Sequence, residues 1–465
     1  MKKFIVTIIL CIMAVGLSAC LASDNAPQSE QGQSQTTAPS KSNSNENTVK
    51  AALEPLDNKQ KTIVVSVLSA TDFYKLAKEK YEKLHPNTTI QLKEFEGSSS
   101  NGLMSKSEVE KYVKQTTTEI LSGKGADLFA FTVINELPID KYINKKAFVN
   151  LDEWMQIDSS FDPNKYQMNI IEGSKLNGAS YILPLEYYLE AYYGDAEAFK
   201  NAGVTIDDKS WTWSDFADIS KQLKAKNNER YAMGNFAPER MINNLVSDNY
   251  SRLIDGAGGK ASFDSPIFMD MLKQAKALYD DKILKSDYVD MKNSSFTYSR
   301  ITSPSDYLVR LGLYYPNGKV YQKPHSSGQR SGVSFEPTNQ IAMNANSKVQ
   351  RDAWEFVKFL LSEEIQSNPR QSGFSMIKAI NDKAIEDLKS KEVLQNTKGG
   401  NIKIKAQDLE PIRELLSAPS VRSMGDESTV QKIIAEETKA FFSGQKTAEA
   451  VAKLIQNRVV TYLNE

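Results

Sequence analysis

Histidine and cysteine, the side chains that most often carry nucleophilic or metal chemistry, are scarce in this chain of 465 residues, which contains two of each. A His-rich metal site is therefore impossible, and a Ser/His/Asp triad would depend on His85 or His325. The acidic pairs Asp280-Asp281 and Glu363-Glu364 lie on predicted helix surfaces, where we interpret them as solvated charge. We expect no catalytic residues, no metal site and no enzymatic activity.

Tyrosine has the most informative spacing. Five of the 20 Tyr lie at positions 181, 187, 188, 192 and 193. A Tyr ring combines a flat apolar face with a polar edge, which suits either contact with a small molecule or packing inside the protein. Successive side chains of a strand point to opposite faces, so only one of Tyr187 and Tyr188 should face a binding cleft.

The first twenty residues indicate the compartment. Two lysines precede an apolar run at residues 4–17, which is too short to cross a membrane and is typical of a secretory signal. The run ends in Leu17-Ser18-Ala19-Cys20, which resembles a bacterial lipobox, where the chain is cut before the Cys and its thiol is acylated. We therefore expect a signal peptide at 1–19 and a lipid anchor at Cys20; a plain secretory signal is the alternative.

The segment after the predicted anchor has the composition of a tether. Residues 21–59 contain no aromatic side chain and are rich in Ser, Gln, Asn and Thr, so they cannot bury enough apolar surface to offset the entropy of ordering. We assign residues 20–59 to the acylated Cys and a disordered tether. The anchor would hold the protein at the outer face of the cytoplasmic membrane. The net charge of −1 offers no attraction for a polyanion, so we expect no nucleic-acid partner.

The folded part begins with alternating strands and helices. The predicted elements are a strand at 62–68, a helix that Asp72 can cap, a strand at 88–92, a helix at 106–121 and a strand at 127–131. This order predicts an open parallel sheet with helices on both faces, whose ligands bind beyond the carboxyl ends of the strands. Asp72, Glu96 and Thr132 lie in the loops at these ends. No phosphate-binding glycine loop follows any of the strands, so we expect no cofactor.

Several segments carry a recognisable pattern. They are Gly125–Phe129, Phe148–Leu151, Tyr181–Glu186, Trp211–Phe216, and Ile341–Lys348 with Ala353–Leu360. Together they resemble the extracellular solute-binding proteins of ABC importers, in particular the large family that binds sugars, over roughly residues 60–465. Trp213 and Trp354 match framework positions of this family, and we assign both to packing.

The resemblance implies an α/β, two-lobed periplasmic-binding-protein-like fold of type II. Each lobe would be a mainly parallel sheet flanked by helices, with a hinge between the lobes. We place lobe one at 60–186 plus 340–365 and lobe two at 187–339 plus 366–465. Closure around one solute would then be the signal that the permease subunits of the importer recognise. We expect a monomer.

A sugar requires flat apolar faces for its ring and fixed hydrogen-bonding groups for its hydroxyls. The candidate ligand-binding residues are Asp72, Glu96, Thr132, Glu186, Tyr187, Tyr188, Phe236, Tyr298 and Phe335. Each has a structural alternative: a helix cap for Asp72, surface charge for Glu96, a turn for Thr132, a structural hydrogen bond for Glu186, and packing for the aromatic residues.

These observations predict a lipid-anchored solute-binding component of an ABC importer, which captures an oligosaccharide or a sugar derivative and performs no catalytic step. The first alternative is a non-sugar solute, such as a peptide or a polyamine. A surface enzyme that acts on polysaccharide and a lipoprotein that presents its cargo to a sensor kinase are the others.

Overall fold

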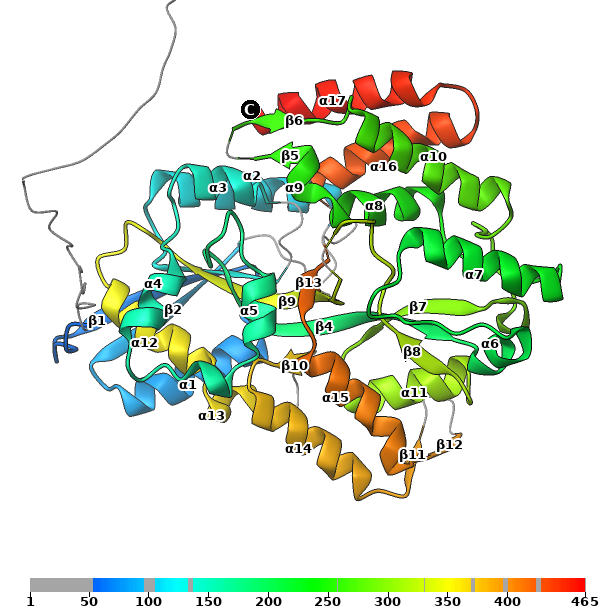
Figure 1. Cartoon of the computed structure of the whole chain (residues 1–465). Coiled ribbons are helices and arrows are strands. Elements are labelled where there is room, and N and C mark those ends of the chain that lie inside the picture. Colours follow the sequence, from blue (N-terminus) through cyan, green and yellow to red (C-terminus); the bar gives the residue numbers. More distant parts are fainter. Residues whose placement is uncertain are drawn as a thin grey trace, which may run out of the picture. The chain divides into compact units, whose positions relative to one another are not determined.

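Strands and helices alternate at the start of the fold in the order that the sequence predicts. The computed structural model contains β1 (Lys61–Val67), α1 (Asp72–Leu84), β2 (Thr88–Glu94), α2 (Lys106–Ser122) and β3 (Leu128–Phe131) (Figure 1). A capping box of Ser105 and Glu108 begins α2, and Gly123 ends it with a left-handed φ of 63°, a conformation that suits glycine. The elements predicted for this part of the chain are confirmed.

The prediction that Asp72 caps α1 is wrong. Thr71 is the N-cap residue, its side chain makes no capping hydrogen bond, and Asp72 is already the first helical residue. The Asp72 carboxylate therefore lies in the first turn, where the partial positive charge of the helix N-terminus favours it.

The structure describes residues 53–95, 105–132, 137–256, 258–329, 331–368, 373–395, 400–423 and 428–464. They all belong to the compact unit Lys50–Glu465. The predictions for the signal peptide, for Cys20 and for Glu96 lie outside the described residues, as does most of the predicted tether. None of the helices in the described part of the chain combines the length and the apolar composition that a membrane span requires.

One sheet of nine strands organises the described residues. Its main path is β10-β4-β9-β3-β1-β2, with β7 and β8 paired to β4 and β13 paired to β9. Strand β1 pairs in parallel with β2 and β3, as predicted. The long strands β4 (Leu183–Gly194) and β9 (Val333–Met343) are antiparallel to each other, and β4 is also antiparallel to β7, β8 and β10. The sheet is therefore mixed, rather than mainly parallel, around β4.

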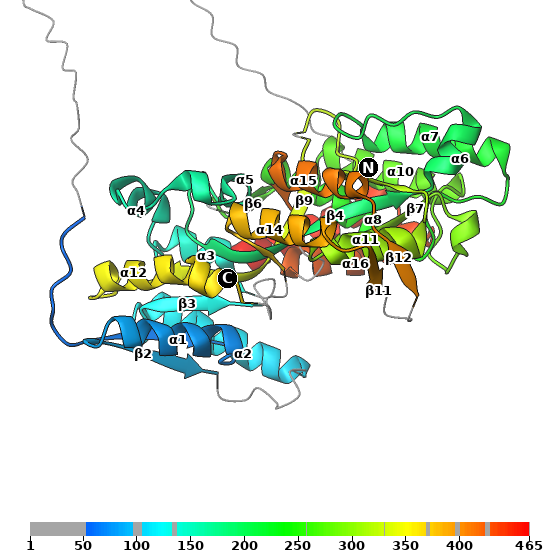
Figure 2. The same ribbon diagram turned by 90° about the horizontal axis from the view of Figure 1, so that it is seen from below.

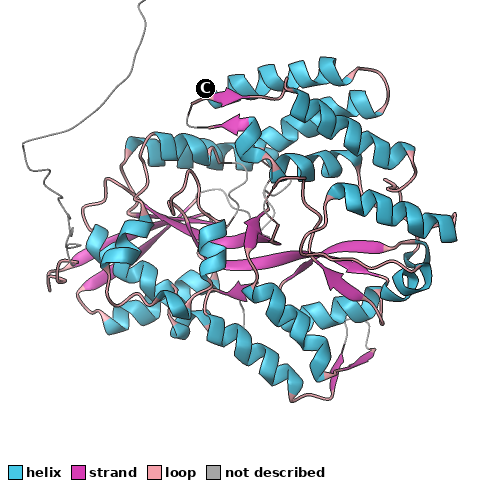
Figure 3. Ribbon diagram, in the orientation of Figure 1, coloured by secondary structure: helices cyan, strands magenta, loops and turns pink. Residues whose placement is uncertain are grey.

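Helices lie on both sides of this band of strands (Figure 3). The remaining elements are α3 (Ile139–Asn144), α4 (Leu151–Ile157), α5 (Met168–Gly173), α6 (Ala196–Ala202), α7 (Trp213–Lys226), α8 (Pro238–Asp248), α9 (Tyr250–Leu253), β5 (Ile254–Asp255), β6 (Lys260–Ala261), α10 (Pro266–Asp280), β7 (Phe296–Ile301), α11 (Pro304–Tyr314), β8 (Lys319–Tyr321), α12 (Gln350–Leu360), α13 (Glu363–Gln366), β10 (Phe374–Ser375), α14 (Lys378–Lys389), β11 (Val393–Gln395), β12 (Asn401–Lys403), α15 (Glu410–Ser417), β13 (Ser420–Arg422), α16 (Thr429–Phe442) and α17 (Ala448–Asn464).

The core explains why these elements assemble. Helices α1 and α12 pack together beside β1, β2 and β3 (Figure 2), and one face of α12 is buried, with Trp354 and Phe356 at 0% exposure. A second cluster contains Trp213 and Phe216 with side chains of α8, α10, α16 and α17. The prediction that Trp213 and Trp354 pack in the core is confirmed. Burial of one such side chain stabilises the fold by about 1.5–3 kcal/mol.

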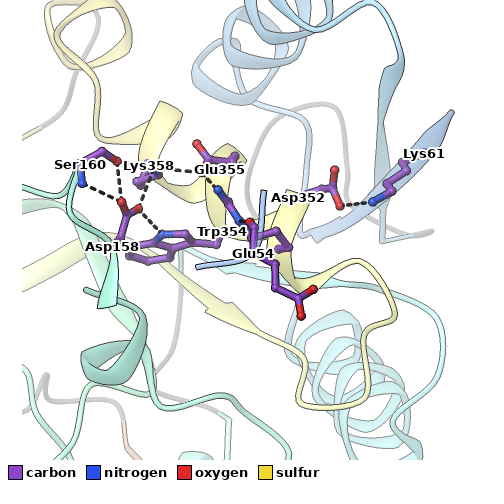
Figure 4. A network of polar contacts seen from close by, with 9 residues as sticks. Glu54, Lys61, Asp158, Ser160, Asp352, Trp354, Glu355 and Lys358 are labelled. Atoms are coloured by element: carbon purple, nitrogen blue, oxygen red, sulfur yellow. Dashed lines mark hydrogen bonds and ion pairs between the residues drawn. The ribbon is translucent and has the colours of Figure 1, made fainter. Parts of the chain in front are cut away.

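Helix α12 is also held by polar contacts (Figure 4). Asp158, which follows α4, accepts hydrogen bonds from Trp354 Nε1 at 2.8 Å and Ser160 Oγ at 2.6 Å, and pairs with Lys358 Nζ at 2.7 Å. Burial raises the pKa of Asp158, but the hydrogen bonds from Lys358, Ser160 and Trp354 outweigh burial and hold this pKa well below its usual range. At the start of the sheet, Lys61 forms a 2.7 Å ion pair with Asp352 of α12.

Candidate ligand-binding site

A cavity of about 850 Å³ lies beside β4 and β9. One set of lining residues comes from Thr132 and from residues 137–145, around α3. A second set comes from α8, α9, the connection between β5 and β6, and the ends of α16 and α17, and a third from β4, β7, β9 and β13. A smaller cavity of about 390 Å³ shares Arg240, Arg300, Glu336 and Ser423 with the first. We treat the two cavities as one site.

The strands place polar side chains on the cavity face because alternate residues share a face. The alternate residues that line the two cavities are Tyr188 and Glu190 of β4, Tyr298 and Arg300 of β7, and Glu336, Thr338 and Gln340 of β9. The register aligns Tyr188 with Glu336 and Glu190 with Arg300. Leu189, which lies between Tyr188 and Glu190, and the preceding residues Tyr187 and Phe335 belong to the apolar core.

Two phenol–carboxylate pairs form the centre of the site. The Tyr188 hydroxyl donates to Glu336 and the Tyr298 hydroxyl donates to Glu190. Ser334 Oγ also donates to Glu190, at 3.0 Å. Arg300 Nη2 lies 3.4 Å from Glu336 Oε2, and its guanidinium carbon lies 4.4 Å from the centre of the Tyr188 ring. The network presents carboxylate oxygens and aromatic rings in fixed positions, which suits binding of a polyhydroxylated molecule.

The protonation of these groups follows from burial and mutual charge. Burial and the nearby Glu190 raise the pKa of Glu336, against the hydrogen bond from Tyr188 and the charges of Arg300 and Arg422. Burial and the charge of Glu336 raise the pKa of Tyr188, and burial and Glu190 do the same for Tyr298. Both phenols therefore stay protonated and act as hydrogen-bond donors at neutral pH.

Basic side chains outnumber acidic ones on the cavity wall. Among the described lining residues, the basic ones are Lys141, Lys145, Arg240, Arg300 and Arg422, and the acidic ones are Asp140 and Glu336. Arg422 Nη2 donates to Gln340 Oε1 at 3.5 Å, and Nη1 is buried without a hydrogen-bond partner among the described residues. Burial lowers the pKa of Arg422, against the charges of Glu336 and Asp140.

Two hydrogen bonds join opposite walls of the cavity. Asn144 Nδ2 of α3 donates to the Gly256 carbonyl oxygen at 2.6 Å, and the Tyr250 hydroxyl of α9 donates to Asp140 Oδ2 at 3.3 Å. All four residues line the cavity. Burial raises the pKa of Asp140, although the hydrogen bond from Tyr250 opposes this shift. The contacts hold α3 against the segment that follows α9.

The structure brings three of the predicted site residues together. Thr132 and Tyr188 line the larger cavity, and Tyr298 lines the smaller one. As the alternation of β4 predicts, only one of the two neighbouring tyrosines faces the cavity: Tyr187 is fully buried, with its ring centre 6.3 Å from that of Phe335. The role of these residues in ligand binding stays a prediction.

The other predicted residues lie away from the cavity wall. Phe335 is fully buried in the same core cluster as Tyr187. Phe236 is 2% exposed and packs in the cluster of Trp213. Glu186 is buried and accepts a 3.5 Å hydrogen bond from Thr338 Oγ1, and Asp72 is exposed at the start of α1. Glu96 lies outside the described residues.

Sequence reasoning missed all of the charged residues that line the two cavities. One local signal was available, because Glu190 follows Tyr188 by two positions in a strand and must share its face. Arg300 follows Tyr298 by the same spacing. Arg422 had no such signal, since it ends a strand of only three residues that pairs with the distant β9. In the described part of the chain, no group of three or more His, Cys, Asp or Glu could hold a metal ion.

The comparisons with known proteins identify the class. Residues 68–367 match the family of bacterial extracellular solute-binding proteins. This match covers more than half of the chain, which therefore belongs to that family. Two relatives named as binding proteins, from Brucella abortus (strain 2308) and Brucella suis biovar 1 (strain 1330), are each 21% identical over 265 residues. The alignments span 54% of this chain and 62% of each relative.

Solved structures of similar architecture support the fold. A periplasmic oligogalacturonide binding protein from Yersinia enterocolitica has a TM-score of 0.59 at 17% identity, covering 87% of this chain and 99% of that one. A family 1 extracellular solute-binding protein from Alicyclobacillus acidocaldarius has a TM-score of 0.57 at 15% identity, covering 88% and 100%. An ABC substrate-binding protein from Listeria monocytogenes in complex with cycloalternan has a TM-score of 0.52 at 15% identity, covering 87% and 100%. The predicted two-lobed α/β fold of the periplasmic-binding-protein type is confirmed.

Proposed function

We propose that this protein is the solute-binding component of an ABC importer and that it captures a carbohydrate in the cavity beside β4 and β9. The observation that carries the proposal is the pairing of Tyr188 with Glu336 and of Tyr298 with Glu190. A carboxylate held by a phenol has acceptor positions left for a second donor, such as a sugar hydroxyl. The adjacent rings supply apolar surface for the C–H faces of the sugar.

The origin of the lining residues supports capture by closure. We propose that lobe one comprises residues 60–186 and 340–365, and lobe two residues 187–339 and 366–465. With these bounds, Thr132, Asp140 and Gln340 line the cavity from lobe one, and Tyr188 and Arg300 from lobe two. A solute that touches both lobes favours the closed form, because only that form makes all the contacts. The permease subunits would recognise the closed form and receive the solute without a catalytic step.

The same proposal includes a membrane anchor. Acylation of Cys20 would tether a monomeric binding protein to the outer face of the cytoplasmic membrane through residues 20–59. Two or three acyl chains hold a protein stably at a bilayer, whereas one chain binds only marginally. Mass spectrometry of the purified membrane form should find an N-terminal fragment that begins at an acylated Cys20.

A thermal-shift screen tests the carbohydrate specificity. The protein is melted alone and with each member of a panel of oligosaccharides, peptides and polyamines. A solute at one hundred times its dissociation constant stabilises the folded state by about 2.7 kcal/mol. We expect at least one saccharide to raise the melting temperature, and no loss of that saccharide on prolonged incubation. Stabilisation by a peptide or polyamine, with none by any saccharide, would contradict the proposal.

A further inference from the structure

The charges on the cavity wall are unbalanced. Five basic side chains and two acidic ones line the larger cavity among the described residues. Only one of the two carboxylates forms an ion pair with a described basic residue, Glu336 with Arg300 at 3.4 Å. Asp140 instead accepts a hydrogen bond from the neutral Tyr250 hydroxyl. Lys141 and Lys145 make no ion pair with any described residue. Among the described lining residues, basic side chains therefore outnumber acidic ones, which favours an anion in this part of the cavity.

Arg422 carries a buried hydrogen-bond donor that has no partner among the described residues. It ends β13, beside β9, and its Nη1 atom is buried without a partner in the described part of the chain. Its one side-chain hydrogen bond there runs to a neutral acceptor, Gln340, at 3.5 Å. A buried charged donor that lacks a partner costs free energy. An anionic acceptor from the solute would remove this cost on binding.

Arginine favours one kind of anion in particular. The planar guanidinium presents its N–H groups as a fork, which matches the two oxygens of a carboxylate in a bidentate arrangement. Arg240 adds a second guanidinium to the same cavity and stacks on the Tyr298 ring at 5.5 Å. The phenol–carboxylate pairs next to these arginines suit neutral hydroxyls. The wall thus combines sites for hydroxyls with a site for a planar acid group.

We propose that the solute is an acidic oligosaccharide built from uronate units, with one carboxylate bound by Arg422. This inference rests on the proposed function and narrows its solute class. The Tyr188–Glu336 and Tyr298–Glu190 pairs would hold the sugar hydroxyls. Lys141 of α3 and Lys145, which follows it, would attract further carboxylates.

The ligand side of the proposal is tested on the unaltered protein. Isothermal titration calorimetry compares trigalacturonate, trimannuronate and a hyaluronan tetrasaccharide with maltotriose, cellotriose and chitotriose. Any uronate that binds is then compared with its methyl ester, which keeps the sugar skeleton and removes the charge. We expect a uronate to bind and its methyl ester to bind at least about tenfold more weakly, the loss expected for a charge-assisted hydrogen bond. Raising the salt concentration should weaken binding of the acid form and leave the ester unchanged.

The protein side is tested with Arg422→Gln and Arg422→Lys. Glutamine removes both the positive charge and the guanidinium N–H donors, whereas lysine keeps the charge and removes only the bidentate geometry. We therefore expect both variants to bind uronate more weakly than the unaltered protein, and Arg422→Gln to bind it most weakly. Arg458→Gln, on α17 and paired with Glu436 and Glu437 outside the cavity, is the matched control and should bind normally. The melting temperature of each free variant shows whether it is folded, and the methyl-ester comparison stands even if Arg422→Gln is not.

The outcomes separate this inference from the proposed function. Binding of neutral saccharides without any uronate, or equal binding of acid and ester, overturns the acidic-solute inference and leaves the carbohydrate proposal intact. Binding of sulfated saccharides alone also overturns it. Uronate binding that Arg422→Gln does not weaken overturns the role of Arg422. Binding of peptides or polyamines alone overturns the carbohydrate proposal and this inference together.

Discussion

Two neighbouring tyrosines of β4 have opposite environments. Tyr188 donates a hydrogen bond to the half-buried Glu336 carboxylate, whereas the Tyr187 hydroxyl is buried without a partner in the described part of the chain. Substitution by Phe removes the hydroxyl of either residue and keeps its ring. The two variants therefore form a matched pair that measures how much the Tyr188 hydrogen bond contributes to stability.

We expect Tyr188→Phe to lower the free energy of unfolding by about 1–3 kcal/mol, because the half-buried Glu336 carboxylate loses a hydrogen-bond donor. Tyr187→Phe should change it by less than about 0.5 kcal/mol, since no hydrogen bond is lost. Urea denaturation monitored by circular dichroism measures both. A Tyr187→Phe variant as unstable as Tyr188→Phe would mean that the Tyr187 hydroxyl has a partner after all.

The same pair shows how much of the site could be predicted from single residues. Alternation along a strand established that Tyr187 and Tyr188 point to opposite faces, and that Glu190 shares the face of Tyr188. It could not establish which face holds the cavity, because this depends on the partners of β4. Arg422 reaches the site only through pairing of β13 with β9, and no local pattern in the sequence encodes that pairing.

Asp158 stabilises the position of α12 through contacts with two of its side chains. Its carboxylate is 7% exposed and joins Lys358 and Trp354 of α12 to the segment after α4. We expect Asp158→Asn to lower the free energy of unfolding at pH 7 by about 1.5–3 kcal/mol, the range for hydrogen bonds to charged groups. Asp264→Asn, an exposed carboxylate before α10, is the control and should have little effect.

The sign of the pH dependence follows from the lowered pKa of Asp158. The unfolded chain binds the proton near pH 3.9, the ordinary value for Asp, whereas the folded chain binds it only at lower pH. The stabilisation is therefore fully present above about pH 5, starts to decrease near pH 4, and is lost only as the pH falls through the lower pKa of the folded state. Denaturation of the wild-type protein and Asp158→Asn at a series of pH values from 7 downward should show the difference in their free energies of unfolding begin to shrink below about pH 4 and shrink further at each lower pH. If the difference in free energy of unfolding between the wild-type protein and Asp158→Asn does not change with pH, the role assigned to Asp158 is contradicted.

The elements differ in how far the sequence predicts them. The elements from β1 to β3 could be predicted from local sequence. Each signal there, such as an apolar run, the Ser105 capping box or Gly123, acts within a single element. Strand β4 was not predictable in the same way, since it pairs with β7, β8, β9 and β10 from four distant parts of the chain. Glu186 and Glu190 alternate with Leu185 and Leu189 along β4, but all residues of this strand are buried, so the alternation does not separate a core face from a solvent face.

Gly256, between β5 and β6, tests the contact of this segment with α3. A Cβ atom there would lie 2.9 Å from Cβ and Cγ of Asp140, closer than side-chain carbons approach one another. Gly256→Val should therefore push the segment away from α3 and break the Asn144 hydrogen bond to the Gly256 carbonyl. We expect the melting temperature of the free protein to change little and solute affinity to fall, because the two cavity walls can no longer meet.

The control for this prediction is Asn228→Ala, which replaces an exposed residue in the turn after α7 and should bind solute normally. Calorimetric titration with the saccharide identified by the screen compares the variants. Unchanged affinity of Gly256→Val would show that binding does not require α3 to contact this segment.

At the scale of the whole molecule, closure depends on two free energies: that of the hydrogen bonds between the cavity walls and that of the contacts with the solute. Each of the two hydrogen bonds between α3 and the opposite wall contributes about 0.5–1.5 kcal/mol, so together they contribute about 1–3 kcal/mol. A change from 1% to 99% closed requires about 5.5 kcal/mol. The wall contacts alone are too weak for that change, and a solute that touches both lobes must supply the remainder.

We therefore expect small-angle scattering of residues 50–465 to give a smaller radius of gyration with saturating saccharide than without. Asn144→Ala removes one wall contact and should raise the saccharide concentration at half-closure by about twofold to tenfold. Scattering curves that coincide with and without a saccharide already known to bind would mean that the lobes do not close on the solute.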